Sequence, residues 1–178
     1  EVAGADSEGI INWASTLARG NATLTAEEGT PRIAGLLAGT GLKESATFAP
    51  LKDFDDVSRL TKTEADAAVG AGKLVGEKVK LSRAVTSLTT TTADKKDSFK
   101  KIRLVEIMDM MKTDIKRTAE DGYIGRFQNS YDNKLLLITA ISQYMQGLVA
   151  DGALAGASCG IDVAAQRKWL VEQGKPAI

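Results

Sequence analysis

Two long apolar-striped segments between Ser98 and Val149 constrain the fold of this chain more than any other feature of its sequence. From 98 to 119 the apolar residues recur at the spacing of one face of an α-helix, and the same pattern returns from 130 to 150. The link between the segments contains Asp121-Gly122, a dipeptide that favours a turn. The pattern predicts two long helices, and we expect the core of the protein to form between them.

Shorter helices and strands are predicted elsewhere in the chain. Capping-box spacings, Thr25 with Glu28 and Thr61 with Glu64, begin two short helices, and Asp162 is the expected N-cap of a third. Thr30-Pro31 is a second start signal for the first of these helices, and Thr63 is an alternative cap for the second. The expected ranges of these helices are 25–38, 61–70 and 162–173. Apolar runs and alternation predict strands over 10–20, 22–24, 46–49, 73–76 and 78–86, with Gly76-Glu77 as a hairpin link.

These elements predict an α+β fold, in which a small mixed β-sheet packs against the two long helices and the short helices are additional. The sheet is expected to form around Ile10, Lys73 and Val79. We expect a single domain over 1–178, with a mixed strand and helix part over 1–93 and a helical part over 94–173.

The charge and residue content narrows the classes of function. The 23 basic residues equal the 23 acidic ones, so no net positive charge attracts nucleic acid or an anionic membrane. No apolar run reaches the roughly 20 residues of a membrane span, and we expect no membrane insertion by this chain. Cys159 is the only cysteine, so an internal disulfide is excluded. Histidine is absent, which removes the commonest general base and metal ligand.

The remaining candidates for chemistry are acidic side chains in two sequence clusters: Asp53, Asp55 and Asp56, and Glu106, Asp109 and Asp114. The first cluster lacks the central Gly and closing Glu of a calcium-binding loop. The second has no base or nucleophile nearby, so we expect it on the solvent face of its helix or paired with Lys112 and Arg117. The Gly-rich segment at 70–73 departs from the phosphate-loop pattern. We therefore expect no catalytic, metal or cofactor site, although a small carboxylate-dependent enzyme without His is the alternative.

A dense basic cluster precedes the first long helical segment and comprises Lys95, Lys96, Lys100, Lys101 and Arg103. Cations at a helix start oppose the helix dipole, and this cost favours a functional reason for their presence. A partner with an acidic surface would supply that reason, and an intracellular adaptor for such partners is a further alternative. Nucleic acid fits less well, because interleaved aromatic residues are missing.

Taken in order, several segments resemble the tail sheath proteins of contractile bacteriophages, above all those of defective prophages and phage-tail-like bacteriocins of Gram-positive bacteria. The segments are EGIINW, TPRIAGLLAGT, SATFAPL, TKTEADAAVGAGKLV, VKLSRAVTSLTT, FKKIRLVEIMDMMKTDIKRTAEDGYIG and NSYDNKLLLITAISQYMQGL. The resemblance covers about residues 6 to 170, and it corresponds to the inner, C-terminal part of the sheath subunit.

The resemblance implies a structural protein and not an enzyme. Such subunits form six-fold rings that stack around a tail tube, and the sheath contracts to drive the tube through a cell envelope. It therefore implies neighbouring sheath subunits and the tail tube protein as partners, and a virion tail or tail-like particle, assembled in the host cytoplasm, as the location. By the same likeness the basic cluster becomes a candidate tube- or neighbour-contact patch. Family members are longer, with terminal arms and an inserted outer domain, so we expect 1–178 to be a fragment of a sheath subunit.

Overall fold

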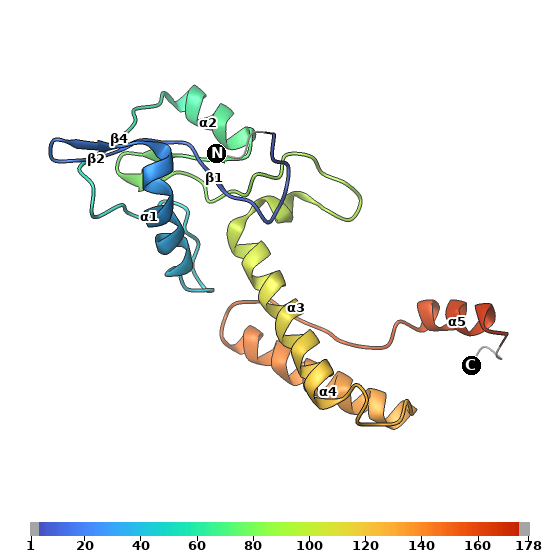
Figure 1. The fold of residues 1–178 in the computed structure, drawn as a ribbon. Coiled ribbons are helices and arrows are strands. Elements are labelled where there is room, and N and C mark those ends of the chain that lie inside the picture. Colours follow the sequence, from blue (N-terminus) through green and yellow to red (C-terminus); the bar gives the residue numbers. More distant parts are fainter. Residues whose placement is uncertain (1–3, 175–178) are drawn as a thin grey trace. The chain divides into compact units, whose positions relative to one another are not determined.

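A computed structural model describes residues 4–174 and divides the chain into two compact units, Glu1–Met110 and Met111–Ile178 (Figure 1). The helices are α1 (Ala26–Ala38), α2 (Lys62–Gly70), α3 (Ile102–Gly122), α4 (Tyr131–Ala150) and α5 (Val163–Glu172), with a 3₁₀ turn, η1, over Asp97–Lys100. The strands are β1 (Asn12–Trp13), β2 (Leu17–Arg19), β3 (Ala22–Leu24), β4 (Asp56–Val57), β5 (Lys73–Leu74), β6 (Gly76–Glu77) and β7 (Lys80–Leu81). This content confirms the expected α+β class.

The short helices begin where their capping residues predict. The hydroxyl of Thr25 accepts a hydrogen bond from the amide of Glu28, and the Glu28 carboxylate accepts one from the Thr25 amide at 2.8 Å. Thr61 and Glu64 repeat this reciprocal pair at the start of α2, and the side chain of Asp162 caps α5. Each cap satisfies amides that the first turn leaves unbonded. The three predicted helix starts are therefore confirmed.

The strands are distributed over three small sheets: β1 with β5 in parallel, β2 between β3 and β4, and β6 with β7, the last two sheets antiparallel. The single strand expected over 10–20 is wrong, because the chain passes from one sheet to another between β1 and β2. Ser15 lies at this passage, fully buried, and its hydroxyl accepts a hydrogen bond from the amide of Gly76 at 3.0 Å. The buried hydroxyl thus ties the end of β1 to the start of β6.

The turn of the β6–β7 hairpin is formed by Lys78 and Val79, so the expected link at Gly76-Glu77 is wrong. Both turn residues have positive φ, 51° and 58°, as a two-residue type I′ turn requires. Gly76 has a packing role instead, since a Cβ there would overlap Cγ1 of Val57. A glycine that permits close approach was read from the sequence as a turn.

The hydrophobic core lies in the first unit. Its buried members are Trp13, Leu17, Ile33, Leu37, Ala46, Leu51, Val57, Leu74, Leu81, Ala84 and Ile102. Each large aliphatic side chain buried in this way contributes roughly 1.5–3 kcal/mol. Only the first residue of α3, Ile102, belongs to this cluster.

The core expected between the two long helical segments is therefore wrong. None of the residues that the structure describes from 111 to 174 is buried, α4 and α5 included. Within the second unit, the hydroxyl of Tyr144 donates a hydrogen bond to the Asp114 carboxylate at 2.6 Å, and Ile115 and Ile141 lie beside it around a cavity of about 60 Å³. An apolar stripe indicates that a helix face will be covered, but it does not indicate which residues cover it.

The start of the described chain is fastened to the segment that precedes η1. The amides of Thr89 and Thr90 donate to the Asp6 carboxylate at 2.6 and 3.1 Å, and Ser87 Oγ donates to the Ser7 carbonyl at 2.9 Å. Hydrogen bonds from the Thr90 side chain and from the two amides hold the pKa of Asp6 well below its usual range. This contact closes the first unit across more than 80 residues of chain.

Candidate functional site

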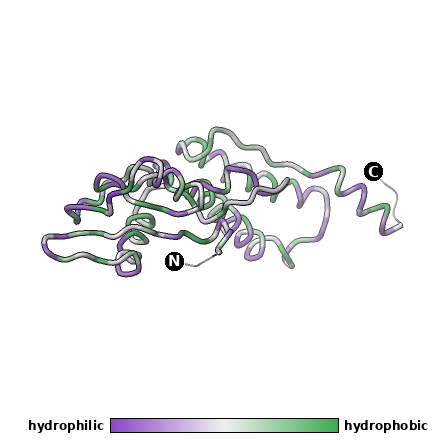
Figure 2. The backbone as a smooth tube through the Cα atoms, turned by 90° about the horizontal axis from the view of Figure 1, so that it is seen from above, coloured by the Kyte–Doolittle hydropathy of each residue, from purple (hydrophilic) through white to green (hydrophobic). Residues whose placement is uncertain are grey.

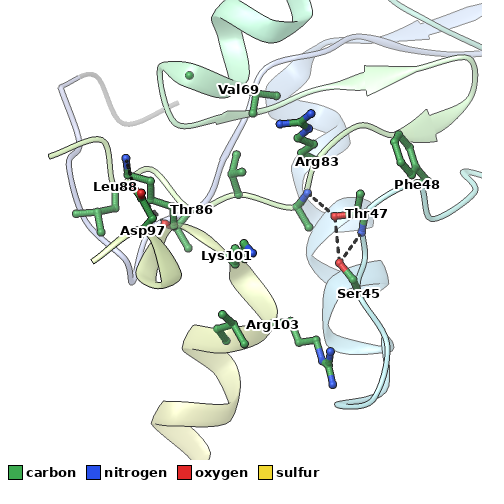
Figure 3. A pocket seen from close by; sticks show the side chains of 15 residues that line it. Ser45, Thr47, Phe48, Val69, Arg83, Thr86, Leu88, Asp97, Lys101 and Arg103 are labelled. Atoms are coloured by element: carbon green, nitrogen blue, oxygen red, sulfur yellow. Dashed lines mark hydrogen bonds and ion pairs between the residues drawn. The ribbon is translucent and has the colours of Figure 1, made fainter. Parts of the chain in front are cut away.

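A groove of about 800 Å³ opens in the first unit beside the start of α3 (Figure 3). The end of α2, the segment 83–88, η1, the first turn of α3 and the loop 45–48 form its walls. Its apolar lining includes Val69, Val85, Leu88 and Leu104. Its charged lining comprises four cations and one carboxylate: Arg83, Lys100, Lys101, Arg103 and Asp97.

Backbone hydrogen bonds fix the wall that carries the cations. The amide of Thr86 donates to the carbonyl of Lys100 at 2.9 Å, and the amide of Ile102 donates to the carbonyl of Ala84 at 3.3 Å. The Thr86 hydroxyl donates to the carbonyl of Phe99 at 3.1 Å. These bonds hold η1 and the first turn of α3 against the segment 83–88, so the cations of both segments face one groove.

The loop 45–48 forms another edge of the groove and presents an aromatic ring. The Thr47 hydroxyl accepts a hydrogen bond from the amide of Ala84 at 3.1 Å, and the amide of Phe48 donates to the carbonyl of Leu81 at 3.1 Å. Phe48 has φ 62° and is 63% exposed. The strand expected here is wrong, because a left-handed residue cannot continue an extended ladder.

The five cations of the predicted contact patch fall into two groups. Lys100, Lys101 and Arg103 line the groove, whereas Lys95 and Lys96 precede η1 and do not line it. The helix start expected at 98 is also wrong, because η1 comes first and α3 begins only at residue 102. The lysines therefore precede α3, and the opposition to its dipole is strongest for Arg103, in the first turn.

Three of these cations have partners within the chain. Lys95 Nζ lies 2.6 Å from the Glu8 carboxylate, and hydrogen bonding to Lys95 lowers the pKa of Glu8. Lys100 pairs with Asp97 at 2.9 Å. Arg103 Nε donates to a backbone carbonyl, that of Leu42, at 2.8 Å.

Lys96 and Lys101 are the two patch cations left over, since no hydrogen bond or ion pair joins either side chain to another residue between 4 and 174. Arg83 is a further cation of the groove that the sequence analysis missed. It is exposed between buried Ser82 and Ala84, and it too has no ion pair among the described residues. The signal in the sequence was a single Arg among the small and apolar residues of the segment 81–85. No local spacing connects Arg83 with the basic cluster, which begins twelve residues later.

The acidic clusters do not converge into a site. Asp53 pairs with Arg32, the Asp55 carboxylate accepts a hydrogen bond from the amide of Gly20, and Asp56 faces Arg59 at 3.4 Å. Over residues 4–174, no group of three or more acidic or cysteine side chains is arranged to hold a metal ion. The first cluster thus serves three separate contacts.

The second acidic cluster is also spread along α3. Asp109 is exposed as expected, and burial raises the pKa of Glu106. Asp114 accepts the hydrogen bond from Tyr144, and Arg117 pairs with Asp121 at 3.6 Å, not with a member of the cluster.

The second unit carries most of the exposed apolar surface of the described chain. Eight of the ten large apolar side chains that are exposed lie there: Ile124, Phe127, Tyr131, Leu135, Leu136, Val163, Trp169 and Val171. An apolar groove of about 600 Å³ runs between α4 and α5, lined by Leu135, Ile138, Leu170 and the single cysteine, Cys159. Figure 2 shows hydrophilic and hydrophobic residues alternating along α5, the helix nearest the C-terminus. Within residues 4–174, no helix is both long enough and apolar enough to cross a bilayer.

Comparisons with known proteins give a consistent family. Residues 94–175 match the family described as phage tail sheath C-terminal domain. The tail sheath protein of Clostridium phage phiCD119 is 36% identical over 171 residues, which cover 93% of this chain and 48% of that protein.

Two solved structures share the fold. A sheath tail protein of Desulfitobacterium hafniense superposes with a TM-score of 0.72 at 28% identity, over 80% of this chain and 35% of its own. A sheath tail protein of Listeria innocua gives the same TM-score at 24% identity, over 83% and 37%. The chain thus spans about half of its phage relative and about a third of these structures. Together, sequence and fold place this chain in the phage tail sheath protein family.

Proposed function

We propose that the chain is a structural, non-enzymatic building block of a contractile tail sheath. In this role it assembles with further copies into stacked hexameric rings around a tail tube, and contraction of the sheath drives the tube through a cell envelope. It acts in a phage tail or a phage-tail-like particle that is assembled in the cytoplasm of a bacterial host.

The observation that carries this proposal is the unburied second unit. None of its described residues, 111–174, is buried, although α4 is apolar around most of its circumference. A helix of that composition is normally covered on all sides, and a unit without a core does not stabilise itself. Contacts with other chains in an assembly would supply the missing burial, as a sheath subunit requires.

The basic patch of Lys95, Lys96, Lys100, Lys101 and Arg103 is proposed to contact the tail tube or a neighbouring subunit. Lys96 and Lys101 support this role, because their charged side chains have no partner among residues 4–174. A charge-reversal series at the patch lysines should weaken sheath assembly around the tube, measured by co-sedimentation. If none of the charge-reversal variants changes assembly, the patch does not contact the tube or a neighbouring subunit.

Electron microscopy of the full-length sheath protein tests the assignment. We expect tubes of stacked rings, whereas monomers that persist at high concentration would contradict it. The variant Leu136→Asp places a charge at an exposed apolar position of α4 and should abolish tubes while the circular dichroism of the monomer stays unchanged. The matched control is Gln143→Asp, which adds the same charge at an exposed polar position of α4 and should keep the tubes.

A further inference from the structure

We propose that the groove beside the start of α3 binds an extended, carboxylate-bearing segment of a different protein chain, with Phe48 as the apolar anchor at its edge. This inference deepens the proposed contact patch and rests on the proposed function. It assigns three patch cations to a defined groove, adds Arg83 and Phe48, and states the chemistry of the occupant.

The charges that line the groove favour an acidic occupant. Four cations face one carboxylate, that of Asp97, so the lining carries a surplus of three positive charges. Arg83 and Lys101 have no ion pair within residues 4–174. Arg103 uses its Nε for the carbonyl of Leu42, and its terminal nitrogens remain for a carboxylate. Opposite charge on a partner would therefore be bound and oriented here.

The placement of Phe48 favours an occupant with an apolar side chain. A left-handed φ of 62° is unfavourable for a residue with a side chain, and the exposed ring gains little packing within the chain that would compensate. Hydrogen bonds of the loop 45–48 nevertheless hold the ring at the groove edge. An exposed aromatic ring beside an arginine without an ion pair is a combination that protein interfaces favour.

The shape and lining of the groove favour a peptide over nucleic acid. Its volume of about 800 Å³ and its apolar lining residues suit a segment that carries apolar side chains, whereas the carboxylate of Asp97 would repel a polyanion. A second copy of this chain offers a poor occupant, because its densest acidic run, 53–56, is already engaged in three separate internal contacts. The occupant that fits is a segment with carboxylates and an apolar residue, supplied by a different protein.

The test is a fluorescence anisotropy titration of the isolated chain with a short labelled peptide in which glutamates alternate with leucines and one phenylalanine. The matched peptide has glutamine in place of each glutamate. We expect the acidic peptide to bind, its affinity to fall as salt is raised, and the glutamine peptide to bind at least about tenfold more weakly.

Variants localise this binding. Arg83→Glu with Lys101→Glu, and separately Phe48→Ala, should each weaken the acidic peptide at least about tenfold. The control pair Lys52→Glu with Lys62→Glu makes the same change of charge at exposed lysines outside both the groove and the basic patch, and should stay within about twofold. Because all substituted side chains are exposed, thermal unfolding should match wild type in each variant.

Three outcomes would overturn the inference: equal binding of both peptides, undiminished binding by the groove variants, or tighter binding of single-stranded DNA than of the acidic peptide. Self-association of the wild-type chain that is lost in the Arg83 and Lys101 variant would assign the groove to a second copy and would also overturn it. Each result is independent of whether the full-length protein forms tubes, so this inference and the sheath proposal can fail separately.

Discussion

Replacement of Gly72 by alanine should destabilise the first unit strongly. Gly72 follows α2 and precedes β5, with φ 70°, and a Cβ there would lie 2.6 Å from the carbonyl oxygen of Ser87 and 2.8 Å from its carbonyl carbon. These are backbone atoms, and the amide of Ser87 is itself bonded to the carbonyl of Ile10 at 2.8 Å. The neighbour therefore cannot yield as a flexible side chain would.

The magnitude follows from three contributions to the free energy of unfolding. A left-handed conformation costs an alanine roughly 1–2 kcal/mol, and overpacking against fixed atoms costs roughly 1–3 kcal/mol. The reduced freedom of the unfolded chain returns about 0.4–1 kcal/mol. The net expectation for Gly72→Ala is a loss of about 1–4.5 kcal/mol.

Urea unfolding followed by the fluorescence of Trp13 measures this loss. Trp13 is 3% exposed and belongs to the core of the first unit, and a Trp169→Phe background removes the exposed second tryptophan. With a slope of about 2 kcal/mol per molar urea, the midpoint should fall by about 0.5–2 M.

The control is Gly70→Ala, two residues earlier. Gly70 lies in α2 with no atom within 4 Å of an added Cβ, so alanine should stabilise the helix by up to about 1 kcal/mol. The reasoning is refuted if the two variants unfold at the same urea concentration, because only their local geometry distinguishes them.

Three further predictions follow from burial and hydrogen bonding. Leu17→Ala should cost about 2–5 kcal/mol in the same unfolding assay because Leu17 is fully buried, whereas Leu136→Ala, at a position 56% exposed, should leave the monomer within about 0.5 kcal/mol. The folded state lowers the pKa of Asp6 below its ordinary 3.8, so the stability that Asp6 contributes is present above about pH 4 and is lost on acidification. The difference in the free energy of unfolding between wild type and Asp6→Asn should therefore narrow as the pH falls below about 4. Partial burial and the hydrogen bond to Asp114 raise the pKa of Tyr144 to about 12 from 10.0, so the stability from that contact is present below pH 10 and is lost as the pH rises towards 12. In a phenolate absorbance titration, Tyr144→Phe should remove a transition near pH 12, and an unchanged titration would contradict the assignment.

Helix starts could be predicted from the sequence because their chemistry is local. Thr25 and Glu28 satisfy each other's amides within one turn, so spacing alone identifies them. Strand boundaries could not, because they depend on distant partners. Ser15 interrupts an apolar run since its hydroxyl binds the amide of Gly76, 61 residues away.

The groove was only partly predictable for the same reason. Lys100, Lys101 and Arg103 are dense in sequence and so were recognised as a patch. Arg83 joins them only through the pairing of the segment 83–88 with the start of α3, and Phe48 through the hydrogen bonds of its loop. Composition identifies a charge cluster, whereas long-range backbone pairing decides which charges share one surface.

The two units differ in the origin of their stability, and this difference gives the sheath proposal its strongest consequence. Leu17 and its neighbours are covered by residues of the same chain, so truncating them lowers the stability of the monomer itself. Apolar side chains of α4 and α5 such as Leu136 and Val171 are largely exposed instead, and none in these helices is buried. Polar substitutions there should leave the unfolding of the monomer unchanged and appear instead in the concentration at which the full-length protein assembles. If Leu136→Asp lowered monomer stability as much as Leu17→Ala does, α4 would already be covered within the monomer, and the main support for an assembly role of the second unit would be lost.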